Sequence, residues 1–553
     1  MPNERFAEVL DDLRRRSLHP TEYNRSELAD RLQVALSALP SPCSANDPWL
    51  GTSTPDFGWL EEFEGIPEQM GDRDQVLTAA AGALTGQLRW HAPGSVFNAT
   101  PVPMLDTVAT TAMANLYSPN ALWDLNSAGA LEVERQVVRQ LAGLAGWDAD
   151  SAGGTFSFGG KAGMIHAIRL GLTRCRPASP IEGLGAGPTP MVVTTEHNHD
   201  CVEEVCALLG LGASACVRVQ AAADVAATTE RVIAAIERLV AEGTTIACVV
   251  LSGGNIVEMA VDRVRPIANH LSAVHRRVGY RPYLHLDTAF GWPWLFFAGY
   301  DFHVNELGIE TAALGSLQRV SRLLAEVNAA DSMTADFHKI GFCPYSSSVF
   351  LTRDGSELSE PAWRPWGENI VSGYTIEHSR SASGILAAWV ALQSAGQVGF
   401  RVQIAHATAT NIRFRQALPS VGYELLNPDS DGLSSVYWPV APGGPASFAE
   451  LRRSDPTLID DANRYTQKLY WRLTGLDGGH GGHVMLGLLP SYGRGARGDP
   501  MAALRIFPGS PHHDETTVDN IAELMFLVKK EFDAYVGQRN HAMDGLRLQR
   551  VPE

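Results

Sequence analysis

The stretch ADSMTADFHKIGFCPYSS, residues 330–347, decides how this sequence is interpreted. It contains a strand-like run that ends in a His-Lys pair, followed by a Cys-Pro turn. A lysine is usually a solvated surface group, and Lys339 taken alone favours that interpretation. A lysine whose pKa is lowered by burial or by a nearby cation is instead a nucleophilic amine, able to form a Schiff base with an aldehyde. The rest of the sequence has to decide between the two.

Short apolar runs alternate with helical patterns from about residue 150 onward. MVVTTE (191–196), IACVVLSGG (246–254) and PYLHLDTAF (282–290) have the length and β-branched content of buried parallel strands. This alternation predicts an α/β fold with a mostly parallel sheet. Ligands of such sheets bind at the carboxyl ends of the strands, so the residues that follow each strand are the candidates for a site.

The flanking regions predict three domains. Residues 1–105 have helical spacing of apolar residues and predict an N-terminal helical segment. Residues 106–390 predict the large α/β domain. Residues 391–553 mix helical and strand patterns and predict a small C-terminal α+β domain.

Composition narrows the classes of partner and compartment. The 553 residues carry 44 basic and 61 acidic side chains, a formal charge of −17, which argues against nucleic acid or an anionic membrane as a partner. No apolar signal region or membrane span is evident. The seven cysteines include no CxxC pair, so we expect reduced thiols in a cytoplasmic protein. His480 and His483 are too few for a metal site, and no metal is predicted.

A glycine-rich turn that runs into a helix is the first candidate for ligand binding. It lies in GGTFSFGGKAGMIHAIRLGL, residues 153–172. Backbone N–H groups at a helix N-terminus bind anions and suit a phosphate, although glycines here often form only a tight turn. Lys161 in this turn either adds charge to a phosphate site or points to solvent.

Two further candidates follow predicted strands. His197 and His199 in TTEHNHDCVEEV are metal ligands, satisfied polar groups, or flat rings on which a ligand stacks. Asp287 in LHLDTAFGW ends an apolar strand, and a buried carboxylate needs a partner. That partner is a protonated heterocyclic nitrogen, a neighbouring arginine or a helix N-terminus.

Together with Lys339, these features specify one ligand. A phosphate cradle, a ring for stacking, a carboxylate for a ring nitrogen and a Schiff-base amine are what pyridoxal 5′-phosphate (PLP) requires. The quoted segments also resemble the group II PLP-dependent amino acid decarboxylases, which include glutamate and aromatic amino acid decarboxylases. ADSMTADFHK resembles the ADS...D.HK signature of that family, and SAGALEVERQVVRQLAGLAG resembles the segment ahead of its glycine loop. The resemblance covers about residues 85–530.

The resemblance implies a fold type I enzyme with a seven-stranded-type, mostly parallel sheet, and a role for each matching residue. Lys339 would bind the cofactor, Asp287 would pair with its ring nitrogen, and His199 and Ala289 would pack on the two ring faces. The residues implied near the phosphate and the lysine are Gly159, Gly160, Lys161, Ser332 and His338. Phe97 and Asn98 resemble a substrate-facing strip, and Arg505 is a candidate anchor for a carboxylate.

The resemblance also implies decarboxylation of an L-amino acid, through an external aldimine and a quinonoid, in a homodimer with shared active sites and with residues 1–105 as a dimerisation segment. Four departures from the family keep alternatives open. The interval from Asp287 to Lys339 is longer than in animal members of the family, and its excess, at about residues 302–325, is expected to be an inserted helix. Asn255 replaces a hydroxyl near the cofactor, and Lys161 stands where the family has a small or hydroxyl residue. The loop at 360–380 holds Trp363 and Trp366 but Tyr374 as its only tyrosine, which is the candidate proton donor.

Without a functional tyrosine, oxidative deamination to an aldehyde or another carbanion reaction is the alternative, and a cofactor-binding protein without activity is a third. The substrate is not named by the sequence. A weak preference for an acidic amino acid rests on the EHNH segment, with Lys161, Arg380 or Arg505 as a partner for its side chain.

Overall fold

The computed structural model describes residues 2–100, 102–185, 187–222, 224–358, 373–479 and 482–539. The chain divides into two units. The first comprises Met1–Ser95 and Trp471–Met485, and the second comprises Val96–Tyr470 and Leu486–Glu553. All predicted site residues belong to the second unit. The predicted domain boundaries at 105 and 390 stay a prediction.

The first unit confirms the predicted N-terminal helices. They are α1 (Pro2–Arg16), α2 (Glu27–Ser37), the 3-10 helix η1 (Gly58–Phe63) and α3 (Arg73–Gly82). Asp72 caps α3 because its carboxylate accepts hydrogen bonds from the backbone N–H groups of Asp74 and Gln75. α2 contacts α3, and Arg31 pairs with Asp74 between them. Phe6 of α1 is 71% exposed, so an apolar face of this helix is uncovered within the chain.

A seven-stranded sheet forms the centre of the second unit, as the sequence predicted. Its strand order is β2-β8-β7-β6-β5-β3-β4. The strands are β2 (Gly153–Ser157), β3 (Met191–Thr195), β4 (Cys216–Val219), β5 (Ile246–Ser252), β6 (Tyr283–Asp287), β7 (Ser332–Asp336) and β8 (Ser348–Thr352). β4, β3, β5, β6 and β7 pair in parallel, whereas β8 runs antiparallel to both β7 and β2. The sheet is therefore mostly parallel.

Side chains of the central strand β5 alternate between two cores, which explains its unbroken apolar sequence. Cys248 and Val250 belong to the cluster that includes α7 and α9. Val249 and Leu251 belong to the cluster that includes α6, α10 and α11. Successive residues of a strand point to opposite faces, so a strand buried on both faces is apolar throughout.

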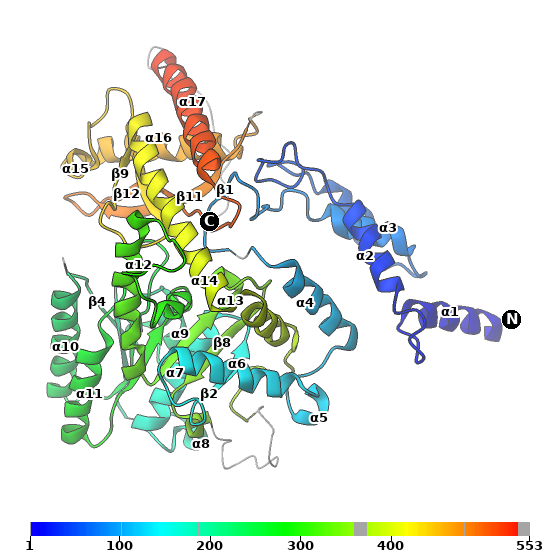
Figure 1. The fold of residues 1–553 in the computed structure, drawn as a ribbon, viewed down its shortest axis with the longest axis horizontal. Coiled ribbons are helices and arrows are strands. Elements are labelled where there is room, and N and C mark those ends of the chain that lie inside the picture. Colours follow the sequence, from blue (N-terminus) through cyan, green and yellow to red (C-terminus); the bar gives the residue numbers. More distant parts are fainter. Residues whose placement is uncertain are drawn as a thin grey trace. The chain divides into compact units, whose positions relative to one another are not determined.

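Helices and 3-10 turns connect these strands in the order that the alternating pattern predicted. They are α4 (Leu105–Tyr117), α5 (Asp124–Ser127), α6 (Ala130–Leu144), α7 (Gly160–Cys175), α8 (Ser179–Glu182), α9 (Cys201–Leu208), η2 (Ala213–Ala215), α10 (Val225–Ala241), α11 (Val264–Val278), η3 (Trp292–Phe297), α12 (Thr311–Leu324), η4 (Ala325–Ala329), α13 (Phe337–Ile340) and η5 (Gly355–Leu358). α10 and α11 lie side by side (Figure 1). α12 is the helix expected in the 302–325 segment, and it buries Leu317 and Val320.

The C-terminal part of the chain mixes helices with a second, five-stranded sheet of order β1-β11-β12-β10-β9. Its strands are β1 (Ser95–Val96), β9 (Tyr423–Leu425), β10 (Ser435–Pro439), β11 (Met485–Arg494) and β12 (Pro500–Ile506). The helices of this part are α14 (Ser383–Ala417), η7 (Leu418–Val421), α15 (Phe448–Leu451), α16 (Pro456–Thr474) and α17 (Glu515–Arg539). α14 is broken at Gly396, which has φ 55° and ψ −175°.

The search for membrane spans covered the described helices. None of them is long and apolar enough to cross a bilayer.

Candidate active site

A cavity of 850 Å³ lies where the predicted strands β3, β5 and β6 end. Most of the predicted site residues line it: Asn98, Gly159, Gly160, Lys161, His199, Asn255, Asp287, Ala289, Lys339 and Arg505. This is the carboxyl edge of the parallel strands, where the fold class placed the ligand site. Residues from distant parts of the sequence thus converge on one cavity.

Lys339 lies in α13, the short helix between β7 and β8. Its Nζ is 3.0 Å from Oδ2 of Asp336, the last residue of β7. Burial opposes the charged amine, but Asp336 and Asp287 outweigh it and raise the pKa of Lys339. The expectation of a lowered lysine pKa is therefore wrong, because the negative charges of Asp336 and Asp287 favour the ammonium.

Asp287 ends β6 and is partly buried. Burial raises the pKa of its carboxyl, and the positive charge of Lys339 only partly opposes this effect. Its Oδ1 accepts one hydrogen bond from the N–H of Ala289 at 3.1 Å, and across the described ranges no ion pair of Asp287 within 4 Å is found. Within the described part of the chain no arginine forms an ion pair with Asp287, so the expected alternative of an arginine partner is not found. A protonated ring nitrogen would supply the missing cation.

The glycine turn at the start of α7 lies close to Asp336 and Ala289. A Cβ on Gly160 would lie 3.1 Å from Oδ2 of Asp336 and 3.4 Å from Cβ of Ala289, so glycine permits this close approach. Gly159 and Gly160 line the cavity at the N-terminus of α7, the kind of helix end that binds anions. Lys161 pairs with Glu204, and both side chains are exposed, so its charge has a partner outside the cavity.

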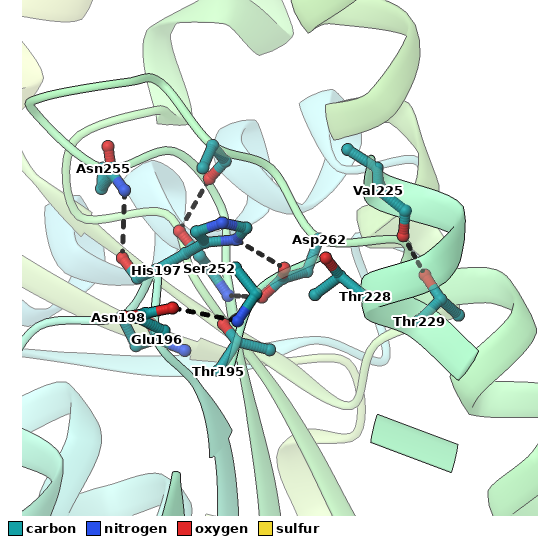
Figure 2. A network of polar contacts seen from close by, with 12 residues as sticks. Thr195, Glu196, His197, Asn198, Val225, Thr228, Thr229, Ser252, Asn255 and Asp262 are labelled. Carbon is teal, nitrogen blue, oxygen red and sulfur yellow. Dashed lines mark hydrogen bonds and ion pairs between the residues drawn. The ribbon is translucent and has the colours of Figure 1, made fainter. Parts of the chain in front are cut away.

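The two histidines after β3 differ in their surroundings. His199 is exposed at the cavity wall, and its Nδ1 accepts a hydrogen bond from the N–H of Cys201 at 3.1 Å. His197 lies in a buried polar network that Figure 2 shows, with Nδ1 3.2 Å from Oδ1 of Asp262. Burial of His197 opposes its charged form, but the hydrogen bond and the negative charge of Asp262 outweigh this effect and raise the pKa of His197. His199 is thus the ring that is free to cover a ligand.

Asp262 fixes the position of His197 because other hydrogen bonds fix Asp262 itself. Its Oδ2 accepts hydrogen bonds from the hydroxyl of Thr195 at 2.6 Å and from the N–H of Ser252 at 2.8 Å. The amide of Asn255 donates to the carbonyl of His197 at 3.2 Å (Figure 2). Asn255 therefore also fixes this loop, besides lining the cavity. No cluster of metal-ligating side chains exists in the described part of the chain.

Arg505 on β12 forms a buried cationic wall of the cavity. Burial lowers the pKa of its guanidinium to about 10. Its Nη2 donates to the carbonyl of Phe97 at 3.2 Å and to Oδ1 of Asn98 at 3.1 Å, whereas its Nε is buried without a hydrogen-bond partner. No carboxylate of the described residues pairs with it within 4 Å. An anionic ligand group would satisfy both the charge and the donor.

Several predicted residues lie away from this cavity. Ser332 is at the start of β7, and its hydroxyl is 2.8 Å from Nδ1 of His285. His338 points at Asp336 with Nε2 3.7 Å from Oδ2, and its Nδ1 accepts from the N–H of Ser347. Ser332 begins β7, whereas Lys339 follows the end of this strand, so Ser332 does not lie beside the lysine or line the cavity.

Tyr374 and Arg380 are packed into the protein. Tyr374 lies against both core clusters, and its carbonyl accepts a hydrogen bond from Arg169 at 2.6 Å. Arg380 is buried and pairs with Glu134 at 2.8 Å, so it is not a partner for a substrate side chain. Trp363, Trp366 and His480 lie outside the described residues, whereas His483 is half-buried with its Nε2 3.2 Å from the carbonyl of Gly479.

Sequence reasoning assigned no role to three residues of the cavity wall. Asp336 is part of the ADS...D.HK signature and contacts Lys339. Tyr345 packs on the ring of His338 with centroids 4.7 Å apart, and it follows Lys339 closely in the sequence. Cys201 lines the wall at the start of α9. The position of Asp336 in the signature could have predicted its role. The positions of Tyr345 and Cys201 in the cavity wall depend on how the loops fold, which no local pattern indicates.

The comparison with protein families decides the class of enzyme. The model of the pyridoxal-dependent decarboxylase conserved domain matches residues 123–424. The chain belongs to this family. The enzyme is a PLP-dependent amino acid decarboxylase, as the motifs around Lys339 predicted, and its cofactor is pyridoxal 5′-phosphate.

Relatives of the enzyme agree with this assignment. The L-2,4-diaminobutyrate decarboxylase of Acinetobacter baumannii is 23% identical over 454 residues, which cover 75% of this chain and 82% of that protein. The L-2,4-diaminobutyrate decarboxylase of Rhizobium meliloti (strain 1021) is 28% identical over 237 residues, which cover 43% of this chain and 41% of that protein. The crystal structure of mouse CSAD superposes with a TM-score of 0.74 at 18% identity, covering 91% of this chain and 99% of that one. This likeness shows the fold type I architecture.

Proposed function

We propose that the enzyme removes the α-carboxylate of an L-amino acid as carbon dioxide and leaves the amine. The observation that carries this proposal is that Lys339 and Asp287 line one cavity of 850 Å³. PLP, when bound, supplies a sink for the electron pair that the departing carbon dioxide leaves behind. The residues below are proposed for the parts of this chemistry that the protein must supply.

Lys339 and Asp287 are proposed to hold the cofactor at its two reactive positions. Lys339 supplies the amine that binds the aldehyde carbon. Asp287 holds a proton on the ring nitrogen, because a buried carboxylate with a single backbone hydrogen bond is stabilised by a cation. Gly159 and Gly160, at the N-terminus of α7, are proposed to bind the phosphate through backbone N–H groups, while His199 and Ala289 would bound the space for the ring.

Arg505 is proposed to bind a carboxylate of the substrate. Its buried Nε lacks a partner, and Asn98 and the carbonyl of Phe97 hold Nη2 in place. Lys161 and Arg380 are paired with Glu204 and Glu134, so neither supports the preference for an acidic substrate. Relatives named for L-2,4-diaminobutyrate make this diamino acid the first substrate to test.

We also infer a cytoplasmic homodimer whose active sites use both subunits. The seven cysteines are free thiols, as in a reducing compartment. Apolar side chains are uncovered on α4, where Leu105 is 85% exposed and Met113 is 55% exposed. Such uncovered apolar residues fit a protein interface. Sedimentation equilibrium tests this inference, and a monomer at micromolar concentration would contradict it.

The experiment that tests the reaction uses the purified enzyme with PLP and a panel of L-amino acids. The panel holds L-2,4-diaminobutyrate, aspartate, glutamate, lysine and the aromatic amino acids. Carbon dioxide, amine, aldehyde and hydrogen peroxide are measured for each, with Lys339→Ala as the inactive control. Equal carbon dioxide and amine without peroxide is the expected result. Aldehyde with peroxide would replace the proposal by oxidative deamination, and no carbon dioxide from any member would contradict it.

A further inference from the structure

Asp336 is the one acidic side chain of the cavity that touches the reactive lysine in the described structure. It ends β7, is 1% exposed, and has Oδ2 at 3.0 Å from Nζ of Lys339. Its Oδ1 accepts a hydrogen bond of 2.5 Å from the hydroxyl of Ser348 on β8. The two oxygens therefore have different nearest partners: Ser348 for Oδ1 and Lys339 for Oδ2, with Nε2 of His338 farther from Oδ2 at 3.7 Å.

We propose that Asp336 holds Lys339 as an ammonium whenever this lysine is not bonded to the cofactor, so that the freed lysine does not recapture the cofactor from the substrate. This inference rests on the proposed function. An amine attacks an aldehyde only as the neutral form, because the ammonium has no lone pair. Asp336 acts through Lys339 and is a positioning residue in this scheme.

The proton balance of this step closes within the pair. When the ammonium of Lys339 bonds to the aldehyde of the cofactor, one proton passes from Nζ to Oδ2 of Asp336. The other two N–H hydrogens leave with the aldehyde oxygen as water, and a C=N bond replaces the C=O bond. When the substrate amine displaces Lys339, its two N–H hydrogens pass to Nζ, and the proton on Oδ2 also returns to Nζ, which restores the ammonium and the carboxylate. Ammonium with carboxylate and amine with carboxylic acid have the same total charge, so no external acid or base is consumed.

Other titratable groups around Asp336 are less well placed for this role. Those that face it are Lys339 and His338 on α13, Asp287 at the end of β6 and Tyr345 before β8. His338 is 3.7 Å from Oδ2, and its Nδ1 already accepts from the N–H of Ser347. The same charges support the proposal, since the pKa of Lys339 is raised even though burial opposes its charge.

Competitive labelling of the cofactor-free protein tests the proposal without relying on activity. Trace labelled acetic anhydride reacts only with the neutral amine, and mass spectrometry of the Lys339 peptide gives the pH midpoint. In Asp336→Asn we expect this midpoint to fall by roughly 1–3 pH units, the usual effect of removing an opposite charge at this distance. An unchanged midpoint overturns the proposal.

Matched variants separate charge from structure. Ser348→Ala keeps the carboxylate and is expected to leave the midpoint near that of the wild type, as is Asp301→Asn, which removes an exposed carboxylate outside the cavity. Asp336→Ser removes the same charge if Asp336→Asn does not fold. A fall in the midpoint for Asp301→Asn equal to that for Asp336→Asn would also overturn the proposal.

A second measurement links the pair to turnover. With the substrate found in the amino acid panel, KM of Asp336→Asn is expected to rise by up to about tenfold for each pH unit lost from the midpoint, with kcat less affected. An unchanged KM together with a shifted midpoint overturns the recapture argument. If no amino acid is decarboxylated, the proposed function fails, while the labelling midpoint still shows whether Asp336 holds the lysine proton.

Discussion

Two acidic residues at the ends of neighbouring strands have opposite surroundings. Asp331, directly before β7, is 2% exposed, and its Oδ2 meets Arg174 at 3.0 Å and Arg281 at 2.5 Å. Arg353 approaches Oδ1 of Asp331 at 3.3 Å, and the N–H of Leu284 donates to Oδ2 at 2.8 Å. Asp287, at the end of β6, has one backbone donor and no ion pair within the described structure.

The difference separates a structural carboxylate from one that needs a ligand. The protein itself supplies every partner of Asp331, so its charge is compensated before anything binds. The pKa of Asp287 is raised by burial, which means that its charge is not fully compensated until a cation arrives. Asp287 is the last residue of an apolar strand, and Asp331 directly precedes another. Only Asp287 lies at the carboxyl edge of the sheet.

Removing the compensated charge has the largest expected effect on stability. Asp331→Asn leaves three arginines facing an amide, and breaking a buried ion pair costs about 3 kcal/mol or more. We expect the midpoint of thermal unfolding to fall by several degrees. Calorimetry of the cofactor-free protein measures it, with Asp354→Asn, an exposed residue after β8, as the control. A midpoint within a degree of the wild type would show that the charge of Asp331 does not stabilise the fold.

Removing the uncompensated charge is expected to affect activity instead. In Asp287→Asn, kcat/KM should fall by about a hundredfold or more, which is ~2.7 kcal/mol of transition-state stabilisation. The substitution should leave stability equal or higher at neutral pH. A carboxyl group whose pKa is raised by folding destabilises the folded state at pH values above its ordinary pKa of 3.8. At pH values below 3.8 the group has no such effect.

Two measurements check this prediction together. Steady-state kinetics gives kcat/KM, and thermal unfolding at pH 7 and at pH 3.5 gives the sign of the stability change. A loss of stability in Asp287→Asn that is larger at pH 7 than at pH 3.5 would show that Asp287 is a structural carboxylate like Asp331.

Arg505 provides an intermediate case, a buried cation without an acidic partner. In Arg505→Gln we expect KM for the substrate to rise by roughly ten- to thirtyfold, or ~1.4–2 kcal/mol, since a charged hydrogen bond is lost. Arg494→Gln, on exposed β11, is the control. Gly487→Ala should raise KM less, because its Cβ would lie 3.2 Å from Nε of Arg505. An unchanged KM in Arg505→Gln would place the carboxylate elsewhere.

Lys161 should show the smallest effect. Its exposed pair with Glu204 already has both charges in solvent, and exposed pairs contribute little. Lys161→Ala is therefore expected to change the affinity for PLP by no more than about twofold. Fluorescence titration with PLP measures this affinity. A tenfold loss would show that Lys161 leaves Glu204 to contact the phosphate.

The sheet and much of the cavity could be predicted because they depend on local sequence patterns. Strand-length apolar runs located β3, β5 and β6, and the residues that follow them include His199 and Asp287. Ser332 was placed near the lysine through the resemblance of its motif to the family signature, and a motif does not give the distance between its members. β7 extends from Ser332 to Asp336, at about 3.3 Å per residue, so Ser332 and Lys339 lie toward opposite ends.

The remaining differences come from long-range packing. The partner of Arg380 is Glu134, which is 246 residues away in the chain, and no local pattern indicates this pair. Tyr374 is likewise held by Arg169, 205 residues away. The raised pKa of Lys339 depends on the direction in which Asp336 points from β7, which the motif alone does not give.

Cys201 in the cavity wall has a consequence for chemical inhibition. Burial, together with the charge of Asp287, raises the pKa of its thiol to about 12. Only the thiolate is a strong nucleophile, so at neutral pH the thiol is a poor target for ordinary alkylating reagents and mild oxidants. An electrophile aimed at this cysteine has to be part of a molecule that first binds in the cavity. The selectivity of such an inhibitor therefore depends on its binding in the cavity more than on the reactivity of the thiol.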